Sequence, residues 1–238
     1  MNYLLEGLLN LIFPPREECP LCGGNSPGSA ICLDCSCWLA AVQKEQYCYT
    51  CGRPIGKGSL CNDCLERQWP FTLCRAVGPY SGPLKEAVHR LKYQGKQQLA
   101  TPLGRLMAQQ VVNEMVYRSV DMVVPIPMAP SKLRRRAFNQ AHLLAVEVAK
   151  AIDRPLNEVL QKKTDTVPQA NLTRQQREKN LQQAFFLVDN VNIHQRKILL
   201  IDDVITTGST LSAAADVLRQ GGASAVLALT LAATPRTK

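Results

Sequence analysis

The sequence Ile198-Leu-Leu-Ile-Asp-Asp-Val-Ile-Thr-Thr-Gly-Ser-Thr210 decides the fold class, because it changes within one turn from apolar residues to residues that bind anions. Residues 198–201 are leucines and β-branched residues, which are typical of a strand buried on both faces of a parallel sheet. Asp202 and Asp203 follow at its carboxyl end, where open α/β sheets bind ligands. The stretch therefore predicts an α/β fold whose open sheet is mainly parallel and is flanked by helices.

The next five residues predict a phosphate-binding loop. They are Thr206, Thr207, Gly208, Ser209 and Thr210. Their hydroxyls, the permissive glycine and the start of a helix together form a site that favours anions. The competing interpretation is an ordinary turn whose Asp and Thr side chains only cap the helix. Because a cap needs one such side chain, we favour a sugar phosphate, with its hydroxyls on the acidic pair and its 5′-phosphate on the loop.

The cysteines and the charge divide the chain into two parts. All 10 cysteines lie between Cys19 and Cys74 of the 238 residues. Residues 1–75 carry 6 Lys and Arg against 7 Asp and Glu, a net charge of −1, and the other 163 residues carry 22 against 12, a net charge of +10. The positive excess indicates an anionic ligand in the second part. We expect a cysteine module at 19–72 and an α/β domain at 73–238.

Eight of the cysteines form an internal repeat. Cys19-x2-Cys22-x9-Cys32-x2-Cys35 recurs 29 residues later as Cys48-x2-Cys51-x9-Cys61-x2-Cys64. In both copies a glycine follows the second cysteine, at Gly23 and Gly52, and allows a tight knuckle there. Two C-x2-C pairs place four thiolates around one centre. We therefore predict two structural zinc ions in a zinc-ribbon-like module that folds together with its metal.

Other interpretations of the cysteines compete with zinc. Disulfides suit a secreted chain, and residues 1–18 lack a signal peptide's positive start and cleavage site. Rubredoxin-like iron shares the same tetrahedral geometry of four sulfur atoms, whereas redox catalysis does not need four pairs. The spacing leaves open whether ligands pair within or between repeats. Cys37 and Cys74 are left over and are predicted to be free core thiols.

Residues 1–18 predict an amphipathic helix that packs on the rest of the protein, with weak contact to a membrane surface as the alternative. The segment is too short to span a bilayer, and no other stretch approaches that length. The sequence therefore predicts a cytoplasmic protein.

A second anion site is predicted after an apolar strand at 122–127. A small-residue turn, four cations and a helix follow that strand, an arrangement that grips pyrophosphate. The alternative is a solvated basic face. The expected pyrophosphate residues are Met128, Lys132, Arg134 and Arg136.

The remaining elements are predicted from their periodicity. We expect strands at 73–80, 185–188 and 225–231, and amphipathic helices at 82–95 and 102–118, the second with Met115 on its core face. Residues 164–184 are polar and basic, which is typical of a lid.

The motifs occur in the order seen in one known family. They are Gly82-Pro-Leu-Lys-Glu-Ala-Val-His-Arg-Leu-Lys-Tyr-Gln-Gly95, Pro125-Ile-Pro127, Ala137-Phe-Asn-Gln-Ala141, Gln169 with Leu172, Arg177 and Asn180, and the loop at 206–210. Over nearly the whole chain the sequence resembles the ComF family, which includes competence proteins and GntX-type proteins linked to the use of DNA as a nutrient. That family joins a cysteine-rich zinc finger to a type I phosphoribosyltransferase-like domain. Ala137 stands where many members have glycine.

The resemblance implies binding of phosphoribosyl pyrophosphate (PRPP) together with magnesium. Asp202 and Asp203 would hold the ribose hydroxyls, residues 206–210 the 5′-phosphate, and Arg177 would act from the lid. A nitrogen nucleophile would then attack C1 of the ribose while pyrophosphate leaves. No hood for an acceptor follows the last strand, so the acceptor stays unidentified, and so does the oligomeric state.

A second hypothesis is a non-catalytic factor that senses PRPP, or keeps a relic of its site, and acts with DNA or the DNA-uptake machinery. The cysteine module is net negative, and aromatic residues make up only 5% of the chain, which leaves little surface for stacking on bases. Any direct DNA contact is therefore expected from the basic domain.

Overall fold

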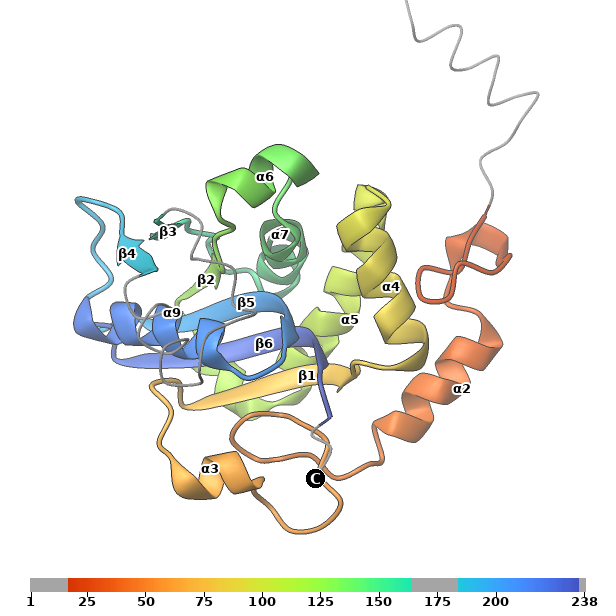
Figure 1. The fold of residues 1–238 in the computed structure, drawn as a ribbon, viewed down its shortest axis with the longest axis horizontal. Helices are drawn as coiled ribbons and strands as arrows, with labels where there is room; N and C mark the ends of the chain where they lie inside the picture. Colours follow the sequence, from red (N-terminus) through yellow and green to blue (C-terminus); the bar gives the residue numbers. More distant parts are fainter. Residues whose placement is uncertain (1–16, 164–183, 236–238) are drawn as a thin grey trace, which may run out of the picture.

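The computed structural model describes residues 17–163 and 184–235, and a parallel sheet lies at its centre (Figure 1). The strand order is β1-β6-β5-β2. The strands are β1 (Leu73–Pro79), β2 (Met122–Pro125), β5 (Lys197–Ile205) and β6 (Ala225–Ala233). All three pairings, β1 with β6, β6 with β5 and β5 with β2, are parallel. The predicted α/β fold with an open parallel sheet is confirmed.

Strand β5 is longer than the sequence predicts. Its ladder with β6 continues to Ile205 opposite Ala233, whereas its ladder with β2 ends at Ile201 opposite Pro125. Asp202 and Asp203 therefore lie inside β5 and not after it. Backbone pairing explains the difference, since a carboxylate side chain does not interrupt the hydrogen bonds of the ladder. On the β2 side, the acidic pair lies just beyond the end of the ladder.

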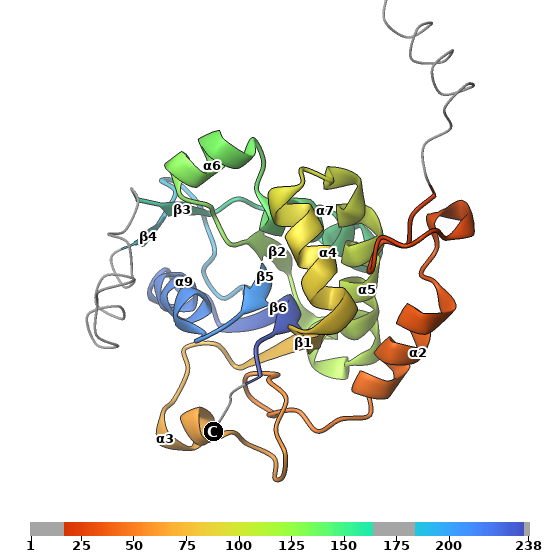
Figure 2. The same cartoon turned by 45° about the vertical axis from the view of Figure 1, so that its right-hand side comes forward.

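Helices cover both faces of the sheet (Figure 2). One face carries α4 (Gly82–Tyr93), α5 (Ala100–Asn113) and α7 (Gln140–Ile152), and the other carries α9 (Ser209–Gln220). The antiparallel ribbon of β3 (Leu160–Lys162) and β4 (Phe185–Leu187) adds to the α9 side. Leu199 and Ile201 of β5 enter the first core, and Ile198 and Leu200 enter the second. The strand is thus buried on both faces, as predicted.

The helix expected at 102–118 is shorter. Helix α5 ends at Asn113, and a 3-10 turn, η3 (Met115–Ser119), follows. Glu114 between them is extended and pairs with Arg75 of β1 at 2.8 Å. This ion pair holds Glu114 in its extended conformation, so the helical pattern of buried residues ends with α5. Met115 is 76% exposed, and its predicted core position is wrong.

The cysteine module lies along the β1 edge of the sheet (Figure 1). It contains η1 (Pro27–Ser29), α2 (Leu33–Val42) and α3 (Asn62–Glu66). Cysteines of the first repeat pack into the core under α4, and those of the second pack into the core under α9. The two repeats therefore reach opposite faces of one sheet.

The remaining short elements are η2 (Gln97–Leu99) and α6 (Pro130–Arg136). The predicted N-terminal helix lies outside the described residues except for its last two positions, and so does the predicted lid, with Arg177, except for residue 184. Within 17–163 and 184–235, no helix is long and apolar enough to cross a membrane.

Candidate functional site

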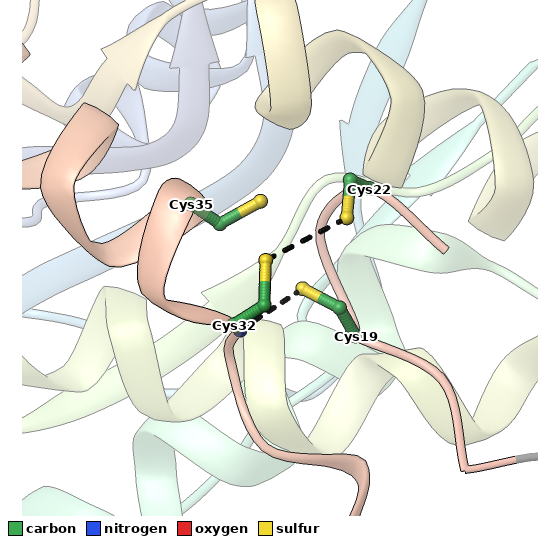
Figure 3. Close-up of side chains that lie close together, drawn as sticks. All are labelled: Cys19, Cys22, Cys32 and Cys35. Atoms are coloured by element: carbon green, nitrogen blue, oxygen red, sulfur yellow. Dashed lines mark hydrogen bonds between the residues drawn. The ribbon is translucent and has the colours of Figure 1, made fainter. Parts of the chain in front are cut away.

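Each cysteine repeat brings its own four sulfur atoms together. In both groups all four Sγ atoms lie within 4.8 Å of one another, and Figure 3 shows the first group. Cys22 Sγ lies 3.8 Å from Cys32 Sγ, and Cys51 Sγ lies 3.6 Å from Cys61 Sγ. Tetrahedral zinc, with bonds of about 2.3 Å, holds its sulfur ligands about 3.8 Å apart. The groups are two zinc-binding sites of four cysteines each, and their ligands pair within each repeat.

Backbone amides support the sulfur atoms at equivalent positions. Cys32 N donates to Cys19 Sγ at 3.4 Å, and Cys61 N donates to Cys48 Sγ at 3.3 Å. The glycines after the second cysteine have φ of 79° and 68°, as the predicted knuckle requires. Such donors stabilise thiolates, which are the form that binds zinc.

The thiols of one group influence each other's ionisation. A hydrogen bond from Cys51 lowers the pKa of Cys48 to about 4, and the same contact raises the pKa of Cys51. Burial raises the pKa of Cys64 to about 12. A cation is needed to ionise all four, so zinc binding releases protons.

The two leftover cysteines differ from each other. Cys74 is buried, as predicted, and burial raises its pKa to about 12. Cys37 is exposed, so its prediction as a core thiol is wrong. It follows the buried Cys35 by two positions in α2, which places it on the other side of that helix.

The acidic pair of β5 meets a lysine from α4. Lys92 Nζ lies 2.8 Å from Asp203 Oδ1, and Asp203 N donates to Asp202 Oδ1 at 2.8 Å. Burial and the charge of Asp203 raise the pKa of Asp202 to about 7. Burial lowers the pKa of Lys92, but the Asp203 carboxylate outweighs it and the pKa is raised. One carboxylate is thus paired with a cation, and the other titrates near neutral pH.

The loop after β5 has the geometry of an anion site. Gly208 is the N-cap of α9, with φ of 81°, a value that L side chains rarely adopt. Ser209 N donates to Thr207 Oγ1 at 3.3 Å, and the two hydroxyl oxygens lie 2.9 Å apart. Thr206 and Thr207 are exposed. The first backbone amides of this 12-residue helix point towards its N-terminus, where an anion would bind.

The predicted pyrophosphate residues are only partly brought to this site. Lys132 and Arg134 are exposed on α6, and Met128 is half-buried beside a cavity of about 560 Å³. Arg136 stacks 4.9 Å from the ring centre of Tyr93, which follows Lys92 in α4. Arg136 is thus linked to the acidic pair through α4.

Ala137 shows why glycine is expected at its position. It caps the C-terminus of α6 in the left-handed conformation, with φ of 64°. A residue with a Cβ atom adopts this conformation at a cost of about 1 kcal/mol or more. Other contacts of the folded chain must offset that cost.

Sequence reasoning missed Lys92 and treated α4 only as packing. The available signal was the cation beside an apolar face in the Gly82–Gly95 motif, and the fold was needed to see that it reaches Asp203.

Comparison with known families gives the class of protein. A profile described as "Phosphoribosyl transferase domain" matches residues 96–238, and one described as "Double zinc ribbon domain" matches residues 8–65. The chain belongs to the phosphoribosyl transferase domain family, in the branch that carries an N-terminal double zinc ribbon and includes bacterial DNA utilization and competence proteins.

Among its relatives is DNA utilization protein YhgH of Salmonella typhi, 33% identical over 197 residues that cover 80% of this chain and 85% of that protein. Competence protein F of Haemophilus influenzae is 29% identical over 213 residues, 86% of this chain and 92% of that protein. Glutamine PRPP amidotransferase of B. subtilis is a distant structural neighbour, with a TM-score of 0.40 and 18% identity over 56% of this chain and 26% of that one.

Proposed function

We propose that the protein binds PRPP with magnesium at the end of β5 and transfers the phosphoribosyl group to an acceptor. One observation carries the proposal: Asp202 and Asp203 lie near the end of β5, and Gly208, five positions after Asp203, caps the start of α9. Two carboxylates and a helix N-terminus lie along one short segment, as a ribose 5-phosphate requires. The acidic pair accepts hydrogen bonds from the ribose hydroxyls, and residues 206–210 bind the 5′-phosphate.

In the proposed reaction, the bond from C1 to the pyrophosphate oxygen breaks and its electron pair leaves with pyrophosphate. The acceptor nitrogen forms the new bond to C1 and loses a proton. Arg136, with Lys132 and Arg134 on α6, stabilises the leaving charge, and Arg177, which lies outside the described residues, is the further cation proposed for this role. The carboxylates of Asp202 and Asp203 are ligands of the type that magnesium prefers and would hold it, and magnesium bound there with PRPP would neutralise charge on the diphosphate. Cysteines arranged as metal ligands suit a reducing compartment, so we place the protein in the cytoplasm.

A second candidate is a non-catalytic factor that senses PRPP and acts with DNA. The names of the relatives favour it, as does the net charge of +10 on residues 76–238. Release of pyrophosphate separates the two candidates, because only the transferase breaks the bond to C1.

Calorimetry with PRPP and magnesium tests the binding. Replacing both acids, in Asp202→Asn/Asp203→Asn, should cost about 1.5–3 kcal/mol for each charge-assisted bond that is lost. Asp189→Asn, in an exposed turn, is the control and should bind like the wild type. Equal affinity in the double variant and the wild type contradicts the proposal. A screen of nucleobases for pyrophosphate release then decides between transferase and sensor.

A further inference from the structure

Side chains from the second cysteine repeat and the segment after it meet the predicted phosphate loop. The ring of Trp69 packs against Gly208 so closely that a Cβ atom there would lie 2.7 Å from Cη2. Arg67 Nη2 donates to the carbonyl oxygen of Thr207 at 3.5 Å. The guanidinium of Arg67 also lies 3.4 Å from the centre of the Trp69 ring. The loop therefore rests on side chains of the cysteine module.

The tryptophan that contacts the loop also contacts the metal site. Trp69 Nε1 donates to Cys64 Sγ at 3.1 Å. Cys64 is one of the four ligands of the second zinc site. An indole N–H that points at a thiolate fixes the plane of the ring, and the face of that ring fixes Gly208. The position of the loop thus depends on the second zinc site through one side chain.

Arg53 adds a positive charge behind the same loop. Its side chain is 1% exposed, and Nη1 pairs with Asp63 at 2.9 Å. Its Nη2 lies 3.5 Å from the position that a Cβ of Gly208 would occupy. Among the described residues, neither Nη2 nor Nε has a hydrogen-bond partner. A buried guanidinium with unused donors is costly unless a second anion offsets it, and the side with the unused donors faces the loop.

The first repeat has neither Arg53 nor Trp69 at the equivalent positions. The 29-residue offset places Gly24 where the second repeat has Arg53, and Ala40 where the chain later has Trp69. Neither glycine nor alanine can supply a cation or a ring. The arrangement is therefore not a general requirement of a four-cysteine site in this chain, and it belongs to the repeat that touches the loop.

We propose that the second zinc repeat and the segment after it contribute directly to anion binding at this loop, and that the anion is a sugar 5′-phosphate. Arg53 supplies a fixed positive charge behind the loop, where burial limits screening by salt. Trp69, oriented by Cys64, holds Gly208 so that the amides at the start of α9 point at the phosphate. Arg53 and Trp69 are positioning residues, and the inference rests on the proposed role of residues 206–210.

Calorimetry with two separate probes, ribose 5-phosphate and inorganic pyrophosphate, tests the inference on the full-length protein. Arg53→Met should bind ribose 5-phosphate about tenfold more weakly, while Arg53→Lys keeps the charge and should retain most of the affinity. Trp69→Phe loses the N–H donor to Cys64 and the ring edge that contacts Gly208, and it should bind ribose 5-phosphate several-fold more weakly. Pyrophosphate affinity should change little in all three, because that anion is assigned to the α6 side.

The matched control is Trp38→Phe in α2, which should weaken ribose 5-phosphate binding less than Trp69→Phe does, because Trp38 contacts Gly82 of α4 and not the loop. Zinc content and thermal unfolding are measured for every variant, and two zinc ions per chain are expected throughout. If Arg53→Met does not fold, Trp69→Phe decides alone. Unchanged ribose 5-phosphate affinity in Trp69→Phe, or an equal loss for both probes, overturns the inference while PRPP binding by the wild type stands. Failure of the wild type to bind either PRPP or ribose 5-phosphate overturns the proposed function as well.

Discussion

The two cysteine repeats share their spacing and their knuckles, yet they support different parts of the domain. The chain has two tryptophans, Trp38 and Trp69, and each lies against a glycine of positive φ. Trp38 packs on Gly82 at the start of α4, and Trp69 packs on Gly208 at the start of α9. Each repeat thus fixes the first residues of one helix.

The two helices lead to the same site from opposite faces of the sheet. The first repeat is bound to α4 by Arg90, which donates to Cys19 O at 3.0 Å and pairs with Glu18 at 2.6 Å. Helix α4 then presents Lys92 to Asp203. Trp69, just after the second repeat, contacts the predicted phosphate loop directly. A duplicated metal module therefore supports the acidic pair indirectly and the loop directly.

The largest expected effect comes from removing one zinc ligand in each repeat. The Cys51→Ser variant should fail to bind the second zinc ion, and most of it should be insoluble. Cys51 is buried, and loss of a structural metal lowers the free energy of unfolding by about 4 kcal/mol or more. Cys22 is exposed, so Cys22→Ser should be milder. Metal analysis and urea unfolding measure both effects. Iron in place of zinc, or fewer than two metals in folded wild-type protein, contradicts the assignment.

Detaching the first repeat from α4 should lower stability without weakening phosphate binding. Arg90 is 3% exposed, and Arg90→Met leaves buried carbonyl oxygens without their donor. We expect the free energy of unfolding to fall by about 2–4 kcal/mol. Denaturant unfolding measures the loss, and titration with ribose 5-phosphate provides the comparison. If Arg90→Met weakens ribose 5-phosphate binding as much as Arg53→Met does, the two repeats do not differ in their effect on the loop.

Affinity for PRPP should rise with pH, since the acidic pair accepts hydrogen bonds best when ionised. The pKa of Asp202 is raised from 3.8 to about 7, so affinity should increase about tenfold between about pH 6 and pH 8. For the same reason this group should lower stability as pH rises from 3.8 to about 7, because the unfolded chain loses the proton first. Asp202→Asn provides the baseline for titration of PRPP itself, and an identical rise in that variant refutes the assignment.

The smallest effect concerns the link from the first repeat to the acidic pair. Lys92 holds the pKa of Asp202 down, so Lys92→Met should raise the pH midpoint of PRPP affinity by about one unit. Calorimetry across a pH series measures the midpoint, with Lys85→Met on the exposed face of α4 as the control. A midpoint that stays in place, or moves down, shows that α4 does not act on the pair.

Local sequence signals were sufficient for much of this fold. The apolar run at 198–201 identified the buried strand, and the duplicated spacing identified both zinc sites down to their knuckle glycines. These features depend on residues within a few positions of one another. Met115 and Cys37 were misplaced because the end of α5 at Glu114 and the burial of one face of α2 depend on contacts with distant residues.

The contacts that join the modules were beyond sequence reasoning for a similar reason. Trp69 and Gly208 are separated by 139 positions, and nothing in either local stretch indicates that they meet. Lys92 likewise reads as one cation in the last turn of an amphipathic helix. Strand β3 has three residues, too few for a periodic signal. Long-range packing alone sets these features.

A crystal structure with PRPP and magnesium tests the central claim most directly. We predict the 5′-phosphate on the amides of residues 207–210, in front of Gly208 and opposite Trp69, with the ribose hydroxyls on Asp202 and Asp203. Lys92 should stay paired with Asp203, and each four-cysteine group should hold one zinc ion. PRPP bound elsewhere, with the acidic pair and this loop free of ligand, would contradict the account.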